Sequence, residues 1–152
     1  MKVCIMRHGE AGFSASSDSG RSLTSRGIKQ SQQAAQWLKQ LNYQFDLGLV
    51  SPYLRAQQTF AELTSQLVVS HVESNNILVP SGDPSKIVNL LAMLSSTGVN
   101  NVIVVSHLPL VGYLVNELCP EISHPMFTTA AIACIDLSLD IVGKLEWFHQ
   151  VE

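Results

Sequence analysis

The sequence of 152 residues has no basic run and no acidic tail, and its net charge is −3. Without clustered lysine and arginine, nucleic acid is excluded as the main partner, because proteins bind phosphate backbones through such clusters. No apolar run reaches the roughly 18 residues that a membrane-spanning helix needs. The apolar stretch before Arg7 is too short for a signal peptide, so we expect a cytoplasmic protein.

Cysteine is also scarce. The chain has three, Cys4, Cys119 and Cys134, an odd number without the paired spacing of a zinc site. Two lie within apolar runs and the third follows Leu118, which indicates buried and inert thiols. No cluster of carboxylates is present to hold magnesium, so the sequence predicts no metal and no other cofactor.

Apolar segments of strand length alternate with segments of helical periodicity. The clearest strand is Val102–Val105, where four β-branched residues without alternation indicate burial on both faces. The alternation predicts a single α/β domain over residues 1–152, a three-layer sandwich with a mostly parallel sheet and helices on both faces. The other expected strands are 2–6, 47–50, 67–72, 130–137 and 144–151, and helices are expected from Thr24 or Ser25 to Leu41, from Ser51, from Asp83 to Gly98, and over 110–118.

Three of the expected strands lead into residues that are costly to bury. The first runs into Arg7 and His8, the second is followed by a turn and Arg55, and the clearest strand is followed by His107. Ligands of open α/β sheets bind just outside the carboxyl ends of the strands, so these side chains are expected at one edge. Taken alone, the residues after the first strand fit a surface position equally well, and Arg55 fits a solvated surface position better than an anion site. Together, in an acidic protein, they predict an anion site.

The residue types at this edge suit phosphoryl chemistry. Ser51 and Pro52 predict a helix cap and first turn, which places Arg55 where it opposes the helix dipole unless an anion lies between them. Arginine forks match phosphoryl oxygens, and imidazole is a competent nucleophile. The simplest chemistry is attack on phosphorus by one histidine while the other groups hold the oxygens.

These residues also carry a family resemblance. Arg7-His8-Gly9-Glu10 resembles the signature of the histidine phosphatase superfamily, which includes phosphoglycerate mutases and acid phosphatases. Later motifs resemble those of the family in the same order: Leu23-Thr24-x-x-Gly27, Ser51-Pro52-x-x-Arg55-Ala56-x-Gln58-Thr59 and Ser106-His107. The short length and the stretch 125–129 look most like the SixA-type phosphohistidine phosphatases.

The resemblance implies a phosphoglycerate mutase-like fold without a cap domain, and a role for each matched residue. His8 matches the nucleophile that becomes phosphorylated. The phosphate pocket would consist of Arg7, Arg55 and His107, with Arg21 as a further contributor at its rim. The implied partner is a bacterial histidine-containing phosphotransfer protein or domain.

One departure from the family bears on the substrate. Larger members carry a carboxylate proton donor in an inserted segment or just after the second histidine, whereas here Leu108 follows His107 and no insertion is present. Asp83 reads as a helix cap, and Glu10 and Asp18 have no clear role. An alkoxide leaving group needs a proton, whereas an imidazole of pKa ~6.5 departs readily near neutrality.

We therefore predict a protein phosphohistidine phosphatase with a phosphohistidine enzyme intermediate. A small-molecule phosphomonoesterase, a mutase and a noncatalytic phosphate-reading module remain as alternatives. No segment is long enough to fold over the pocket as a separate lid, so an open pocket is expected, which would enclose small esters poorly. The polar loop Ala11–Arg21 is expected to cross the site or its rim.

Overall fold

The computed structural model describes residues 1–123 and 125–151, and a six-stranded sheet lies at its centre. The strands are β1 (Lys2–Arg7), β2 (Phe45–Val50), β3 (Val69–Ser74), β4 (Asn101–Ser106), β5 (Ile132–Leu137) and β6 (Gly143–His149). They are arranged in the order β3-β2-β4-β1-β5-β6. Strands β1 to β4 are parallel, and β5 is antiparallel to both of its neighbours. The predicted, mostly parallel sheet is confirmed.

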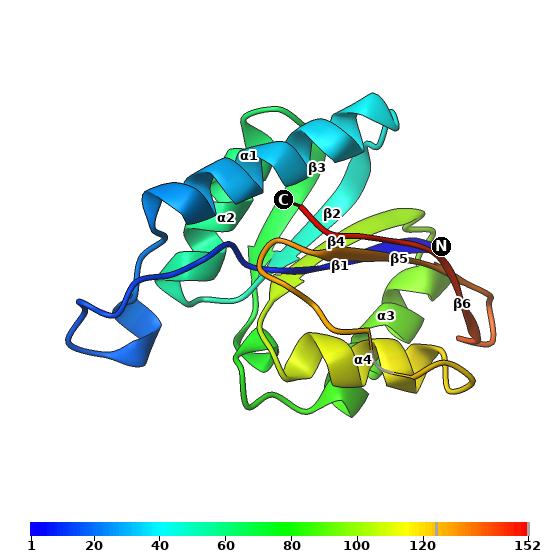
Figure 1. Cartoon of the computed structure of the whole chain (residues 1–152). Coiled ribbons are helices and arrows are strands. Elements are labelled where there is room, and N and C mark those ends of the chain that lie inside the picture. The colour runs from blue at the N-terminus through cyan, green and yellow to red at the C-terminus, as the bar shows by residue number, and fades with distance from the viewer. Residues whose placement is uncertain (124, 152) are drawn as a thin grey trace.

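Two pairs of helices cover the sheet and complete the predicted three layers (Figure 1). Helices α1 (Ser25–Gln40) and α2 (Leu54–Thr64) pack on one face, and α3 (Pro84–Ser96) and α4 (Leu110–Leu118) pack on the other. Two short 3₁₀ helices, η1 (Asp18–Gly20) and η2 (Asn76–Leu78), lie in the connections. No helix within the described residues is both long and apolar enough to cross a membrane.

The unbroken apolar runs of the central strands supply both faces of the sheet. In β1, Val3 and Ile5 belong to the core beneath α3 and α4, whereas Cys4 and Met6 belong to the core beneath α1 and α2. Successive strand residues point to opposite faces, so a strand with helices on both sides must be apolar throughout. The same reasoning explains Val102–Val105 of β4, which is fully buried.

Two of the three predicted helix caps are confirmed. The Thr24 hydroxyl accepts from a backbone N–H of the first turn of α1, and the Asp83 carboxylate does the same for α3, which begins with Pro84. The cap predicted at Ser51 is wrong, because α2 begins only at Leu54. The Ser51 hydroxyl instead serves the candidate site described below.

The weak strand predicted at 67–72 is displaced, because β3 spans Val69–Ser74. Its extent is set by its parallel partner, since Phe45 of β2 pairs with Val69 and Val50 pairs with Ser74. An edge strand tolerates polar residues, so apolar content is a poor guide to where it ends. The two late strands form the predicted antiparallel hairpin.

Candidate active site

The register of the central strands brings His8 and His107 together. Arg7 pairs with Ser106 in the parallel ladder of β1 and β4, so the residues that follow lie side by side. Their ring centroids are 5.0 Å apart. The His8 backbone is held on both sides: its N–H donates to the Ser106 carbonyl and its carbonyl accepts from the Ala130 N–H, each at 3.0 Å. Strand pairing thus positions both imidazoles at the carboxyl edge of the sheet.

One ring nitrogen of His8 carries no hydrogen and presents its electron pair to the site. Its Nδ1 lies 2.6 Å from the carbonyl oxygen of Gly9, which can only accept, so Nδ1 carries the hydrogen. Its Nε2 accepts from Nε–H of Arg55 at 3.2 Å. Burial and then the nearby arginines lower the pKa of His8 to about 4, against the opposing effect of the Gly9 carbonyl. The ring is therefore neutral at pH 7, and Nε2 is the nitrogen that can act as a nucleophile.

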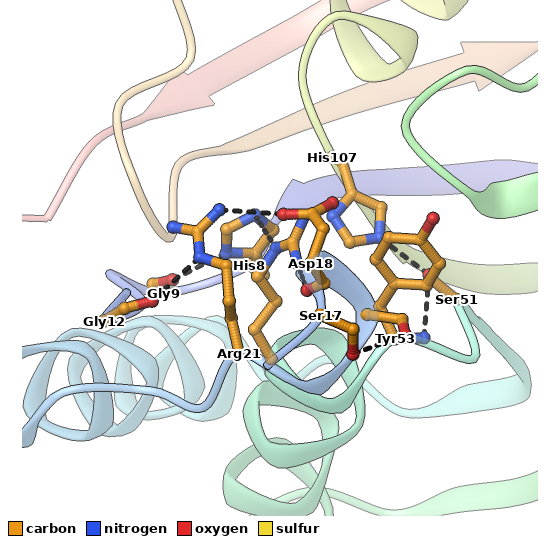
Figure 2. Close-up of polar contacts among 11 residues, drawn as sticks. His8, Gly9, Gly12, Ser17, Asp18, Arg21, Ser51, Tyr53 and His107 are labelled. Carbon is orange, nitrogen blue, oxygen red and sulfur yellow. Dashed lines mark hydrogen bonds and ion pairs between the residues drawn. The ribbon is translucent and has the colours of Figure 1, made fainter. Parts of the chain in front are cut away.

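His107 is anchored through its other nitrogen. Its Nε2 lies 2.7 Å from Oγ of Ser51, which also accepts from the Tyr53 N–H at 3.2 Å. Nδ1 is buried and has no partner within the described chain. Burial and then the neighbouring His8 lower the pKa of His107 to about 3, so this ring is also neutral at pH 7. Figure 2 shows its edge away from Ser51 facing the group around His8.

The two arginines at this edge differ in how their donors are used. Arg7 donates from Nη1 to the Phe127 carbonyl at 2.9 Å, while its buried Nε has no partner in the described chain. Arg55, the second residue of α2, donates to His8 and to Asp18. Buried donors without partners are costly, and a tetrahedral oxyanion would supply acceptors for them. The site therefore has the donors for a phosphoryl group.

The loop 11–21 crosses the site, as predicted. From η1, the Asp18 carbonyl accepts from Nη1 of Arg55 at 2.7 Å, and its carboxylate lies 3.3 Å from Nη2 of the same side chain. Arg21 stands at the rim, where it donates to the Gly12 carbonyl at 2.8 Å and pairs with Asp18 at 3.1 Å. Figure 2 shows Asp18 in the midst of this group.

The pocket is consequently less open than the sequence predicts. His8 is 6% exposed, Arg55 4% and His107 1%. No inserted lid is needed for this cover, because the short loop places Asp18 directly on the Arg55 guanidinium. The sequence shows the loop but not the contact that draws it over the pocket.

All four residues predicted for the pocket, namely Arg7, His8, Arg55 and His107, lie at this edge, and Arg21 lies at its rim. Three supporting residues were not predicted. Ser51 anchors His107, Thr59 accepts the Gly9 N–H at 3.0 Å, and Asp18 contacts Arg55. Ser51 and Thr59 belong to the motif around Arg55 and could have been considered from it, whereas nothing in the sequence singles out Asp18.

Gly9 packs closely against the start of α1. A Cβ atom there would lie 2.5 Å from the Gly27 carbonyl oxygen, so the close approach that requires glycine is to the first turn of α1. The other carboxylates near the motifs lie outside the pocket contacts: Glu10 pairs with Arg26 at 2.8 Å, and Asp83 caps α3. Among the described residues, no three His, Cys, Asp or Glu side chains are grouped as metal ligands.

Comparison with known proteins agrees with this geometry. Residues 3–78 match the model of the histidine phosphatase superfamily (branch 1). Phosphohistidine phosphatase SixA of Escherichia coli is 47% identical over 148 residues, which cover 97% of this chain and 92% of that protein. A SixA homolog of Haemophilus influenzae is 40% identical over 141 residues, covering 88% of this chain and 86% of the homolog.

A solved structure agrees as well. The protein histidine phosphatase SixA complexed with tungstate matches with a TM-score of 0.96 and 46% identity, covering 99% of this chain and 97% of that one. The likeness extends over the elements that carry the pocket as well as over the motifs. The chain therefore belongs to the histidine phosphatase superfamily.

Proposed function

We propose that the protein is a cytoplasmic phosphohistidine phosphatase, which moves a phosphoryl group from a histidine of a phosphotransfer protein to His8 and then to water. The observation that carries this proposal is the state of His8, a buried neutral ring whose Nε2 electron pair faces the Arg55 guanidinium. The relative from Escherichia coli, at 47% identity, is a phosphohistidine phosphatase. Tungstate, which is bound in a related structure, is a tetrahedral oxyanion like phosphate.

In the first step, a phosphoryl oxygen takes over the Arg55 donor, which frees Nε2 of His8. A bond forms between Nε2 and phosphorus while the bond from phosphorus to the substrate nitrogen breaks, and its electron pair stays on that nitrogen. Arg7, Arg55 and His107 donate to the equatorial oxygens. Such positioned donors supply most of the catalysis of phosphoryl transfer, because charge is spread over those oxygens.

In the second step, water attacks the phosphorus of phosphorylated His8. The bond from phosphorus to Nε2 breaks, its electron pair returns to Nε2, and the proton lost by water leaves with the phosphate. In both steps Nδ1 of His8 keeps its hydrogen and donates it in a hydrogen bond to the Gly9 carbonyl oxygen, 2.6 Å away. The enzyme imidazole can therefore depart in its neutral form, which is a far better leaving group than an anionic ring.

The state of the carboxylates near the motifs favours a substrate with a phosphorus–nitrogen bond over an alkyl phosphate ester, because none of them is available as a proton donor. Asp83 is committed to capping α3, and Glu10 is paired with Arg26. Arg21 holds the pKa of Asp18 below its usual value, so this residue is ionised at neutral pH and has no proton to give to an alkoxide. An imidazole that is already protonated on its far nitrogen needs no such donor.

Exposed apolar residues beside the pocket support a protein as substrate. Phe13 lies 4.2 Å from the Arg21 guanidinium and is 84% exposed. Met126 is 82% exposed and precedes Phe127, whose carbonyl holds Arg7. Apolar side chains that gather around a functional site are typical of surfaces that contact another protein.

The proposal is tested by assaying one preparation on a phosphohistidine-bearing phosphotransfer protein, p-nitrophenyl phosphate and a sugar phosphate. We expect kcat/KM for the phosphoprotein to exceed that for the esters by at least ~10²-fold, and activity to survive EDTA. Equal efficiency on esters would favour a phosphomonoesterase, and transfer of labelled phosphate between substrate positions would favour a mutase. Phosphate release no faster than background would favour a binding module.

A further inference from the structure

Asp18 is the carboxylate of the described chain that is paired with a pocket arginine. One oxygen, Oδ1, lies 3.1 Å from Nη1 of Arg21, and the other, Oδ2, lies 3.3 Å from Nη2 of Arg55. The Asp18 side chain remains 57% exposed, so it stands between the buried nucleophile and the surface. Asp18 has no role in the two catalytic steps proposed above.

The leaving imidazole would be stabilised by a hydrogen-bond acceptor at this position. A phosphohistidine departs as a neutral ring only when the nitrogen opposite phosphorus carries a hydrogen, and an acceptor for that N–H favours the reactive form. For His8 the Gly9 carbonyl is such an acceptor. In-line attack places the departing ring on the side of phosphorus opposite His8. The exposed Asp18 carboxylate is held on the same Arg55 guanidinium that contacts Nε2 of His8, so it lies within reach of that ring.

We propose that Asp18 accepts a hydrogen bond from the protonated ring nitrogen of the substrate phosphohistidine. This inference rests on the proposed function and deepens it. The incoming phosphoryl oxygens take the place of Oδ2 on Arg55, and Oδ2 then receives the ring N–H while Oδ1 stays on Arg21. The bond from nitrogen to phosphorus breaks and its electron pair stays on that nitrogen. The other nitrogen keeps its hydrogen, so no proton moves to or from Asp18.

The surroundings keep Asp18 in the form that this role requires. The charged and titratable groups around its carboxylate are Arg21, Arg55 and His107. The hydrogen bond from Arg21 is the main cause that lowers the pKa of Asp18, so the carboxylate is an acceptor at neutral pH. A phosphate ester with an uncharged leaving group offers no N–H in its place, so Asp18 is a specificity-determining residue for phosphohistidine.

The test compares Asp18→Asn with the wild type on the phosphohistidine protein and on p-nitrophenyl phosphate. We expect the ratio of the two kcat/KM values to fall at least about tenfold, the scale of a charge-assisted hydrogen bond. The loss of activity on phosphohistidine at rising pH should also begin at lower pH in the variant, because the protonated ring loses the negative charge of its acceptor when a neutral amide replaces the carboxylate. Asp140→Asn, in the exposed turn of the late hairpin, removes the same charge elsewhere and should leave the ratio unchanged.

Three results would overturn the inference. An equal loss on both substrates would mean that Asp18 only orders the loop over Arg55. Unchanged phosphohistidine activity in Asp18→Asn would mean that the leaving ring has no need of this carboxylate. Wild-type protein that is inactive on phosphohistidine would overturn the proposed function and the inference with it, so the two failures are distinguishable.

Discussion

The floor and the rim of the pocket are built in different ways. The floor consists of Arg7, His8, Ser51, Arg55 and His107, which are fixed by strand register and by the start of α2. The rim is the loop 11–21, in which Asp18 and Arg21 are held mainly by side-chain contacts. Under the proposed function, the floor contacts the phosphoryl group of any substrate, whereas the rim contacts what is attached to that group. Floor substitutions should therefore lower activity on every substrate, and rim substitutions should change the ratio between substrates.

Burial is the second difference. His8 and His107 are neutral at pH 7 because they are buried away from water. Burial lowers the pKa of His8 to about 4 and that of His107 to about 3. Asp18 is exposed, so its carboxylate is charged at neutral pH, and the hydrogen bond from Arg21 lowers its pKa further. Burying the two imidazoles of the floor lowers the stability of the fold, as is common for catalytic groups. The exposed carboxylate of the rim lowers it little.

The largest effect is expected for His8→Ala. The variant loses the proposed nucleophile, so kcat/KM should fall to background, roughly 10⁴-fold or more, on phosphohistidine and on esters alike. Circular dichroism should show an intact fold. His71→Ala, on the exposed edge strand β3, is the matched control and should keep full activity. Substantial turnover by His8→Ala on either substrate would remove the distinction between floor and rim.

A smaller loss is expected for Arg55→Lys. Arg55 contacts both His8 and Asp18 through different nitrogens of one planar fork, which a lysine ammonium does not reproduce. We expect about a 10²-fold loss of kcat/KM on all substrates, the scale for a preorganised charge-stabilising donor. Arg26→Lys, at an exposed arginine paired with Glu10, should change little. Wild-type rates in Arg55→Lys would show that the fork geometry is unimportant.

The buried imidazoles should also be visible in the pH dependence of stability. The folded-state pKa of His8, about 4, lies below its unfolded value, so as the pH falls the unfolded chain binds the proton first. The free energy of unfolding should therefore decrease between pH 6.5 and pH 4.5, by about 2 to 3 kcal/mol from His8. Urea titrations at the two pH values measure it. His8→Ala should lose less stability over this range than the wild type, and an identical loss would contradict the account.

The smallest of these effects is expected for Ser51→Ala. Without its hydroxyl, His107 loses the contact at Nε2 that orients it, and kcat/KM should fall about tenfold on all substrates, as for other groups that orient a catalytic side chain. Ser106→Ala is the matched control, because it removes a buried hydroxyl next to His107 that donates to the Leu78 carbonyl and not to an imidazole. Equal losses in the two variants would show that Ser51 acts through stability alone.

The contrast between floor and rim also explains what was predictable from the sequence. Arg7 ends β1, and His8 and His107 directly follow β1 and β4, whose apolar runs are clear in the sequence. Their convergence therefore follows from the rule for strand ends. Asp18 could not be predicted, because its contact depends on how a loop without periodicity folds back. The cap predicted at Ser51 was wrong for a related reason, since its hydroxyl is used by His107, which lies 56 residues away in the chain. Local pattern does not report such long-range partners.

The most direct test of the account is to trap the enzyme intermediate. Wild-type protein is mixed with a phosphotransfer protein carrying radiolabelled phosphohistidine and quenched in alkali within milliseconds, and the labelled residue is identified by mass spectrometry. We predict label on His8 that decays as phosphate is released, and no enzyme-bound label in His8→Ala. Label on His107 instead, or release of phosphate at the wild-type rate without any labelled enzyme, would contradict the role assigned to His8.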